Sequence, residues 1–205
     1  MTPRGYVHIE KLADDLFTRS GSPRKSNGWA VDVEAILQIH FSFDVAFIPR
    51  LTLGGNRLSG AYIPARKIVM IEAMDSWQRK RFTMAHETGH AELDFQSFAN
   101  GPAMFELNEP VVYRCPPDRV DDVPQEKPKG DRSEVLANKF AACLLMPSRL
   151  VRDAWIHTHN LEQCANLLEV SRESLGYRLK DLRIIDLGQL QGSDNWLDTL
   201  GGEST

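Results

Sequence analysis

The sequence predicts an α+β fold in which a small, antiparallel, twisted sheet is combined with helices, and three observations support this prediction. Apolar residues recur at helical spacing near the amino terminus and through much of the second half of the chain. Short segments rich in β-formers lie between positions 43 and 72 and are separated by Pro or Gly. The 205 residues are 42% apolar with a net charge of -4, which is typical of a globular protein with a sizeable core.

The first two helices are predicted from apolar spacing and from the residues that begin them. Segment 3–19 starts at a proline, which suits the first helical turn, and its apolar residues fall on one face. These residues are Tyr6, Ile9, Leu12, Ala13, Leu16 and Phe17. A linker at 20–28 contains Gly, Ser and Pro, and Asp32 is a suitable N-cap for a short second helix ending at Ile39.

The central part of the chain is predicted to form the sheet and the helix that follows it. Segments 43–48, 56–63 and 67–72 are the predicted strands. Residues 76–95 follow as a helix, whose apolar side is formed by Phe82, Ala85, Gly89 and Leu93. Because strand 67–72 directly precedes this helix, we expect its edge to be available for an extended substrate segment that adds to the sheet.

Residues 96–132 are predicted to form a long surface loop, since six of the eleven prolines fall there and its later part is dense in charge. Loops of this length are usually functional lids or disordered insertions, and the sequence does not separate the two.

Helical pattern resumes after the loop and continues almost to the end of the chain. The predicted helices are 133–147, 148–157, 161–168 and 171–182. We therefore predict a core at 1–147, a helical extension at 148–185 and an acidic tail at 186–205.

The cysteines and the absence of targeting signals predict a cytoplasmic protein. Cys115, Cys143 and Cys164 are odd in number and form no C-x-x-C pair, which suits a reducing compartment and argues against a cysteine zinc site. Cys143 is interpreted as a small buried hydrophobe, because a redox role requires exposure and a lowered pKa. No segment approaches the roughly eighteen apolar residues of a membrane span, and the amino-terminal sequence does not resemble a signal peptide.

One motif in the predicted helix 76–95 indicates metal binding and catalysis. His86, Glu87 and His90 form H-E-x-x-H, and the i, i+4 spacing places both imidazoles on one helix face, where they can bind one metal ion. Glu87 follows the first histidine and can reach a metal-bound water as a general base. At this composition, H-E-x-x-H is expected by chance in about one such chain in a hundred. The surrounding sequence therefore has to show whether the motif forms a metal site.

A catalytic zinc site needs a third protein ligand, and the sequence offers two acidic residues. A metzincin would continue with Gly and His where this chain has Leu93 and Gln96, so that class is excluded. Asp94 lies on the same helix face as His90, but a third consecutive turn does not easily close a tetrahedron, so we expect Asp94 beside the site or at the surface. Glu134 opens a separate helix that can pack across the first, and it is the predicted third ligand.

Both motifs together resemble the ImmA/IrrE family of zinc metallopeptidases. The matching segments are FTMAHETGH and E-x-x-A-N-x-F-A-A-x-L-L-M-P, and the similarity extends from about Tyr62 to Leu182. The resemblance implies zincin-like helices, a zinc ion bound by His86, His90 and Glu134, and Glu87 as the catalytic residue. It also implies an intracellular protease that cleaves a helix-turn-helix repressor and so relieves repression of stress, prophage or mobile-element genes.

Several features of the predicted site remain open. An oxyanion donor could come from Tyr113, His157 or His159, none of which the sequence positions over the metal. Zinc is the default metal, while the oxygen and nitrogen donors also admit manganese, cobalt or iron. Asn138 is equally well interpreted as a packing residue or as a hydrogen-bond partner of the site.

The carboxyl-terminal helices raise two alternatives to proteolysis. Segment 161–182, with Ser171 as N-cap, resembles a helix-turn-helix reader of DNA. Residues 148–183 contain six Lys or Arg against five Asp or Glu, which is a weak electrostatic basis for DNA binding, so we prefer a helical subdomain that packs on the core or holds the substrate. A non-catalytic zinc-bearing regulator or toxin-antitoxin partner is the other alternative.

Overall fold

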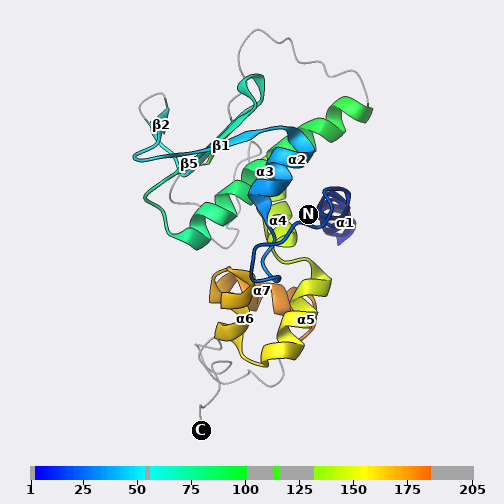
Figure 1. Ribbon diagram of the computed structural model, residues 1–205. Helices are drawn as coiled ribbons and strands as arrows, with labels where there is room; N and C mark the ends of the chain where they lie inside the picture. Colours follow the sequence, from blue (N-terminus) through cyan, green and yellow to red (C-terminus); the bar gives the residue numbers. More distant parts are fainter. Residues whose placement is uncertain (1–2, 54–55, 101–112, 116–131, 186–205) are drawn as a thin grey trace.

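A computed structural model describes residues 3–53, 56–100, 113–115 and 132–185, and it confirms the predicted α+β class (Figure 1). The sheet lies at one end of the molecule and helices α5 to α7 at the other, with α3 and α4 between them (Figure 1). The helices are α1 (Pro3–Arg19), α2 (Val33–Phe41), the 3₁₀ turn η1 (Pro64–Arg66), α3 (Trp77–Asn100), α4 (Arg132–Leu145), α5 (Ser148–Thr158), α6 (Leu161–Leu168) and α7 (Arg172–Asp181). The strands are β1 (Asp44–Ile48), β2 (Thr52–Leu53), β3 (Asn56–Arg57), β4 (Gly60–Ile63), β5 (Ile68–Glu72) and β6 (Tyr113–Cys115).

The first two helices form for the local reasons that the sequence indicates. The apolar face of α1 is buried at Ile9, Leu12 and Leu16 and packs against α4. Helix α2 begins where the Asp32 carboxylate accepts a hydrogen bond from the Ala35 N–H at 3.2 Å. It continues two residues beyond the predicted end, to Phe41, and Ser42 in the left-handed conformation terminates it.

The four-stranded sheet is mixed, which corrects the prediction of a wholly antiparallel one. Its strand order is β1-β5-β4-β6, with β1 parallel to β5 and the other neighbours antiparallel. The chain leaves β1, forms the β2–β3 hairpin and β4, and turns back through η1 into β5. This excursion returns β5 to the side of β1 in the same direction, so the two pair in parallel. The predicted strand 56–63 is correspondingly split into β3 and β4.

Strand β5 has no free edge, so the expectation that an extended substrate adds to it is wrong. It pairs with β1 on one side and with β4 on the other, and the outer strands of the described sheet are β1 and β6. Val69 and Ile71 of β5 are both buried and face the core.

The turn between β1 and β2 is held by a buried carboxylate. Glu72 is 1% exposed and accepts hydrogen bonds from the N–H groups of Arg50, Leu51 and Met74 at 2.9, 2.8 and 3.0 Å. Arg50 has a φ of 56°, an unusual conformation for a residue other than glycine. Three backbone donors on one carboxylate stabilise this turn across the end of β5.

Helix α3 is longer than predicted and shortens the predicted loop 96–132. It extends to Asn100, β6 forms within the loop, and α4 begins at Arg132. The rest of this loop, and the predicted acidic tail 186–205, lie outside the described residues.

A buried arginine near the start of α3 joins distant parts of the chain. Arg81 is 1% exposed and donates to the carbonyl oxygens of Val31 at 3.0 Å and Glu169 at 3.2 Å. Its guanidinium also lies 3.5 Å from the Glu169 carboxylate. Since Glu169 is the C-cap of α6, this contact fixes the carboxyl-terminal helices against α3.

Helices α5, α6 and α7 follow the predicted pattern closely. Asn160 caps α6 and Ser171 caps α7, each accepting a hydrogen bond from an N–H three residues later. Among the described helices, none is both long enough and apolar enough to span a membrane.

Candidate metal centre

Helix α3 brings the three residues of the H-E-x-x-H motif together in the interior of the protein. His86, Glu87 and His90 are 1%, 0% and 2% exposed. One helical turn separates the two imidazoles, and their Nε2 atoms lie 3.1 Å apart. Both rings therefore direct a nitrogen to the same point.

Helix α4 brings Glu134, the predicted third ligand, close to the two histidines. The Glu134 Oε2 atom lies 3.3 Å from His86 Nε2, and its Oε1 atom lies 3.3 Å from His90 Nε2. In a tetrahedral zinc site with bonds of about 2 Å, neighbouring donor atoms are about 3.3 Å apart. The three residues form a group that could hold a metal ion, with candidate donor atoms that all lie within 4.8 Å of one another.

Glycine at position 89 allows α4 to approach α3 this closely. A Cβ atom on Gly89 would lie 3.1 Å from Phe140 Cδ1, 3.2 Å from Ala137 Cα and 3.3 Å from the Ala137 carbonyl oxygen. These separations are tighter than ordinary packing contacts. The small residues of the two motifs, Gly89 and Ala137, thus set the distance over which Glu134 reaches the histidines.

Asn138 lies one turn after Glu134 and contacts the first histidine. Its Oδ1 atom is 2.8 Å from Nδ1 of His86, on the side of the ring away from the atom that faces Glu134. The sequence left this residue open between packing and a hydrogen-bonding role, and the structure brings it to the site.

Glu87 is the most deeply buried charge-bearing group of the site. Burial, and then the charge of Glu134, raise the pKa of Glu87 well above its ordinary value of 4.5. Neither carboxylate oxygen completes a hydrogen bond with a described residue. A Cβ on Gly60 of β4 would lie 3.0 Å from Glu87 Oε1, so the glycine leaves room for this carboxylate under the sheet. Glu87 is therefore placed beside the metal group without itself belonging to it.

The histidines keep Glu134 ionised. Burial acts to raise the pKa of Glu134, but its interactions with His86 and His90 outweigh burial and lower the pKa to about 2. An ionised carboxylate is the form that binds a metal ion.

A second charged cluster on α3, which the sequence did not indicate, anchors the motif helix to both amino-terminal helices. Glu92 is fully buried and pairs with Arg19 of α1 at 2.8 Å. His40 of α2 lies 3.2 Å from Arg19 and 4.0 Å from Glu92. Burial, together with the charge of Arg19, lowers the pKa of His40.

Two of the three candidate oxyanion donors, His157 and His159, have other positions in the described structure. His157 stacks on Trp29 with ring centroids 5.4 Å apart, and His159 is the C-cap of α5. Tyr113 lies opposite Tyr62 in the β4–β6 pair, but its side chain is outside the described part. The Asp94 side chain is outside it as well, whereas Cys143 is buried as expected.

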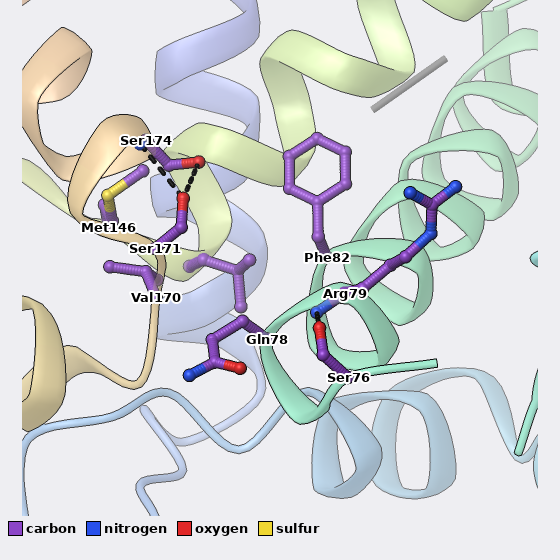
Figure 2. A pocket seen from close by; sticks show the side chains of 9 residues that line it. Ser76, Gln78, Arg79, Phe82, Met146, Val170, Ser171 and Ser174 are labelled. Atoms are coloured by element: carbon purple, nitrogen blue, oxygen red, sulfur yellow. Dashed lines mark hydrogen bonds between the residues drawn. The ribbon is translucent and has the colours of Figure 1, made fainter. Parts of the chain in front are cut away.

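A cavity of about 170 Å³ lies where the start of α3, the end of α4 and the α6–α7 turn meet (Figure 2). Phe82, Met146 and Val170 give it apolar walls, and none of the three metal-binding residues lines it. Figure 2 shows Arg79 directed away from Ser171 and Ser174, and its guanidinium bonds to Ser59 and Asp75. This cavity is separate from the metal group.

One arginine of the α6–α7 pair, Arg178, is buried inside the protein. Arg178 of α7 is 2% exposed, donates to the Met146 carbonyl oxygen at 3.0 Å and pairs with Glu10 of α1 at 2.6 Å. The Arg152 side chain of α5 bonds to the Leu182 carbonyl oxygen at 3.2 Å. The Arg178 contacts attach α7 to α1 and to the end of α4, whereas the Arg152 contact joins α5 to the residue that follows α7.

A long helix bearing H-E-x-x-H under a small mixed sheet, with a glutamate supplied by a second helix, defines a metallopeptidase-like domain. The family model of peptidase M78, the IrrE N-terminal-like domain, matches residues 44–104 and 123–180, which is more than half of the chain. The protein belongs to this family.

A solved structure of a Mycobacterium tuberculosis transcriptional regulator is similar in fold, with a TM-score of 0.55 and 17% sequence identity. The alignment covers 84% of this chain and 46% of the regulator, so this chain spans less than half of that protein. No curated protein matches the sequence.

Proposed function

We propose that the protein is a zinc-dependent endopeptidase that cleaves a specific regulatory protein. The observation that carries the proposal is the convergence of His86, His90 and Glu134 on one point, with the buried Glu87 carboxylate beside them. Membership of the peptidase M78 family supports the same conclusion. The nitrogen and oxygen donors and their spacing fit zinc, and they also admit manganese, cobalt or iron.

The residues of the site have distinct tasks in this proposal. His86, His90 and Glu134 would hold a zinc ion, whose chemistry would be to lower the pKa of a coordinated water to about 7 and to polarise the scissile carbonyl. The Glu87 carboxylate would take a proton from that water and deliver it to the leaving amine. Its burial keeps bulk water from competing for that proton.

We propose a helix-turn-helix repressor as the substrate and the cytoplasm as the place of cleavage. The resemblance to the ImmA/IrrE family supports this choice, and cleavage would relieve repression of stress, prophage or mobile-element genes. The similar fold of a protein named as a transcriptional regulator is consistent with a role in gene regulation.

The test compares wild type with Glu87→Gln, both loaded with zinc, in a protein extract of the source organism. New amino termini are labelled and identified by mass spectrometry. We expect a new terminus within a helix-turn-helix protein for wild type, and a rate about 10² to 10⁴ times lower for the variant because its general base is lost. Equal sets of termini with equal zinc content would contradict the proposal.

A non-catalytic regulator that binds DNA or protein is the second candidate, favoured by the name of the similar structure. The burial of Arg178 removes one cation of α7 from any DNA contact. A duplex-DNA mobility shift that persists at physiological salt, together with unchanged regulation by Glu87→Gln, would favour this candidate.

A further inference from the structure

We infer that Asn138 is a positioning residue, which holds the His86 ring in the tautomer and orientation that metal binding requires. This inference rests on the metal site of the proposed function and assigns a role to a residue outside the ligand set. The primary contact is the 2.8 Å separation between Asn138 Oδ1 and His86 Nδ1.

The contact determines which ring nitrogen carries the proton. An amide oxygen accepts a hydrogen bond, so its partner Nδ1 must be protonated, and a neutral imidazole then has its lone pair on Nε2. Nε2 is the atom that faces Glu134 and His90, at 3.3 and 3.1 Å. The hydrogen bond at one side of the ring thus prepares the other side for a metal ion.

The position of Asn138 on α4 allows the same helix face to present both Asn138 and Glu134 to the site. Asn138 follows Glu134 by four residues, so both lie on the same face of α4. Ala137 between them packs against Gly89, the residue between the two histidines that permits close approach. A single packed surface therefore supplies the third ligand and orients the first one.

The choice of an amide over a carboxylate has a chemical consequence. Asn138 accepts a hydrogen bond from His86 Nδ1–H without adding negative charge to a site that already contains Glu134 and the buried Glu87. An aspartate at this position would provide the same acceptor, whereas a leucine of similar size would provide none.

The test measures zinc affinity of the full-length protein by competition with a chromophoric chelator. We expect Asn138→Leu to bind zinc about 10 to 100 times more weakly than wild type, and Asn138→Asp to restore the affinity, because it restores the acceptor. Lys139→Ala is the matched control: it removes the 2.7 Å ion pair with Asp181 from α4 and leaves His86 untouched. Thermal unfolding of the metal-free variants separates loss of affinity from loss of folding.

A second readout reports the tautomer directly. In zinc-loaded protein labelled with ¹⁵N-histidine, we expect a protected Nδ1 proton on His86 in wild type and Asn138→Asp, and its loss in Asn138→Leu. Wild-type affinity in Asn138→Leu, or failure of Asn138→Asp to restore it, would overturn the inference. Neither readout depends on proteolysis, so an inactive protein with this affinity pattern would contradict the proposed function and leave the inference intact.

Discussion

At the scale of single residues, the metal group combines groups that ordinarily avoid a protein interior. Two imidazoles and the Glu87 carboxylate are almost completely buried, and Glu134 is partly buried against them. Burying ionisable groups costs free energy unless a partner or a metal ion compensates for it. The site is therefore expected to depend on each of its ligands.

Metal content tests the ligand set residue by residue. We expect about one zinc per wild-type chain and a large reduction in His86→Ala and Glu134→Ala, since three protein ligands are needed. Elemental mass spectrometry of proteins purified without chelators gives the measurement. An unchanged zinc content in Glu134→Ala would mean that another residue provides the third ligand. Glu87→Gln, which retains all three predicted ligands, is the control.

Glu72 leads to a prediction about acid stability. Burial acts to raise the pKa of Glu72, but hydrogen bonds from the Met74, Arg50 and Leu51 N–H groups outweigh it, and the pKa is lowered from 4.5. A depressed native pKa contributes stability that is present above 4.5 and is lost as the pH falls through the native value.

We therefore expect Glu72→Gln to lower the free energy of unfolding by about 1–3 kcal/mol at pH 7. The difference from wild type should shrink as the pH falls below about 4.5. Urea unfolding of both proteins between pH 7 and pH 3 measures this. A difference that stays constant with pH would contradict the assignment.

At the scale of secondary-structure elements, the α3–α4 contact determines the metal group. Neither helix contains all the donors, so their separation decides whether Glu134 reaches His86 and His90. Gly89 sets that separation by leaving out a side chain where the backbone of α4 passes.

Gly89→Ala should therefore weaken zinc binding. Alanine favours a helix over glycine by about 1 kcal/mol. Crowding against Ala137 and Phe140 costs about 1–3 kcal/mol, so the free energy of unfolding is expected to fall by between about zero and about 2 kcal/mol. Because the added methyl group pushes α4 away from α3, Glu134 should move away from the histidines. We expect zinc affinity to fall by roughly tenfold as a result.

Thr88→Ala is a suitable control for this prediction. It removes the hydrogen bond from Thr88 Oγ1 to the Met84 carbonyl oxygen within α3 and adds no bulk toward α4. Chelator competition on both variants provides the measurement, and equal affinities would contradict the packing argument.

At the scale of the whole molecule, a metal ion held by His86, His90 and Glu134 would link segments that are distant in sequence. His86 on α3 and Glu134 on α4 are 48 positions apart, and the chain between them includes β6. A ligand that binds only the folded state raises stability according to its concentration relative to its dissociation constant.

We expect zinc at 100 times its dissociation constant to stabilise wild type by about 2.7 kcal/mol. Differential scanning calorimetry with and without zinc measures the shift in Tm. The shift should disappear in Glu134→Ala, and an equal shift in that variant would indicate zinc binding elsewhere.

Features that depend on local sequence signals could be predicted from the sequence. Apolar spacing located the helices, and the capping residues Asp32 and Ser171 marked the starts of α2 and α7. Glu134 was predictable because two histidines on one helix demand a ligand from another. These inferences need only neighbours in sequence or a chemical requirement.

Features that depend on distant segments were not predictable in the same way. The parallel pairing of β1 with β5 follows from the path of the chain, and the pattern of either strand does not specify it. The contact of Asn138 with His86, and the burial of Arg178 against Glu10, depend on the angle and spacing between helices. The angle and the spacing between two helices cannot be derived from the pattern of a single sequence.

The contacts of Arg81 have a consequence for the evolution of this chain. Two of its hydrogen bonds end on the main-chain carbonyl oxygens of residues 31 and 169, which every amino acid provides. A substitution at position 31 therefore leaves its acceptor in place, and one at position 169 removes only the carboxylate that lies 3.5 Å from the guanidinium, whereas a change at position 81 removes the donor for both carbonyl oxygens. Homologous sequences should retain arginine at this position while residue 31 varies independently of it.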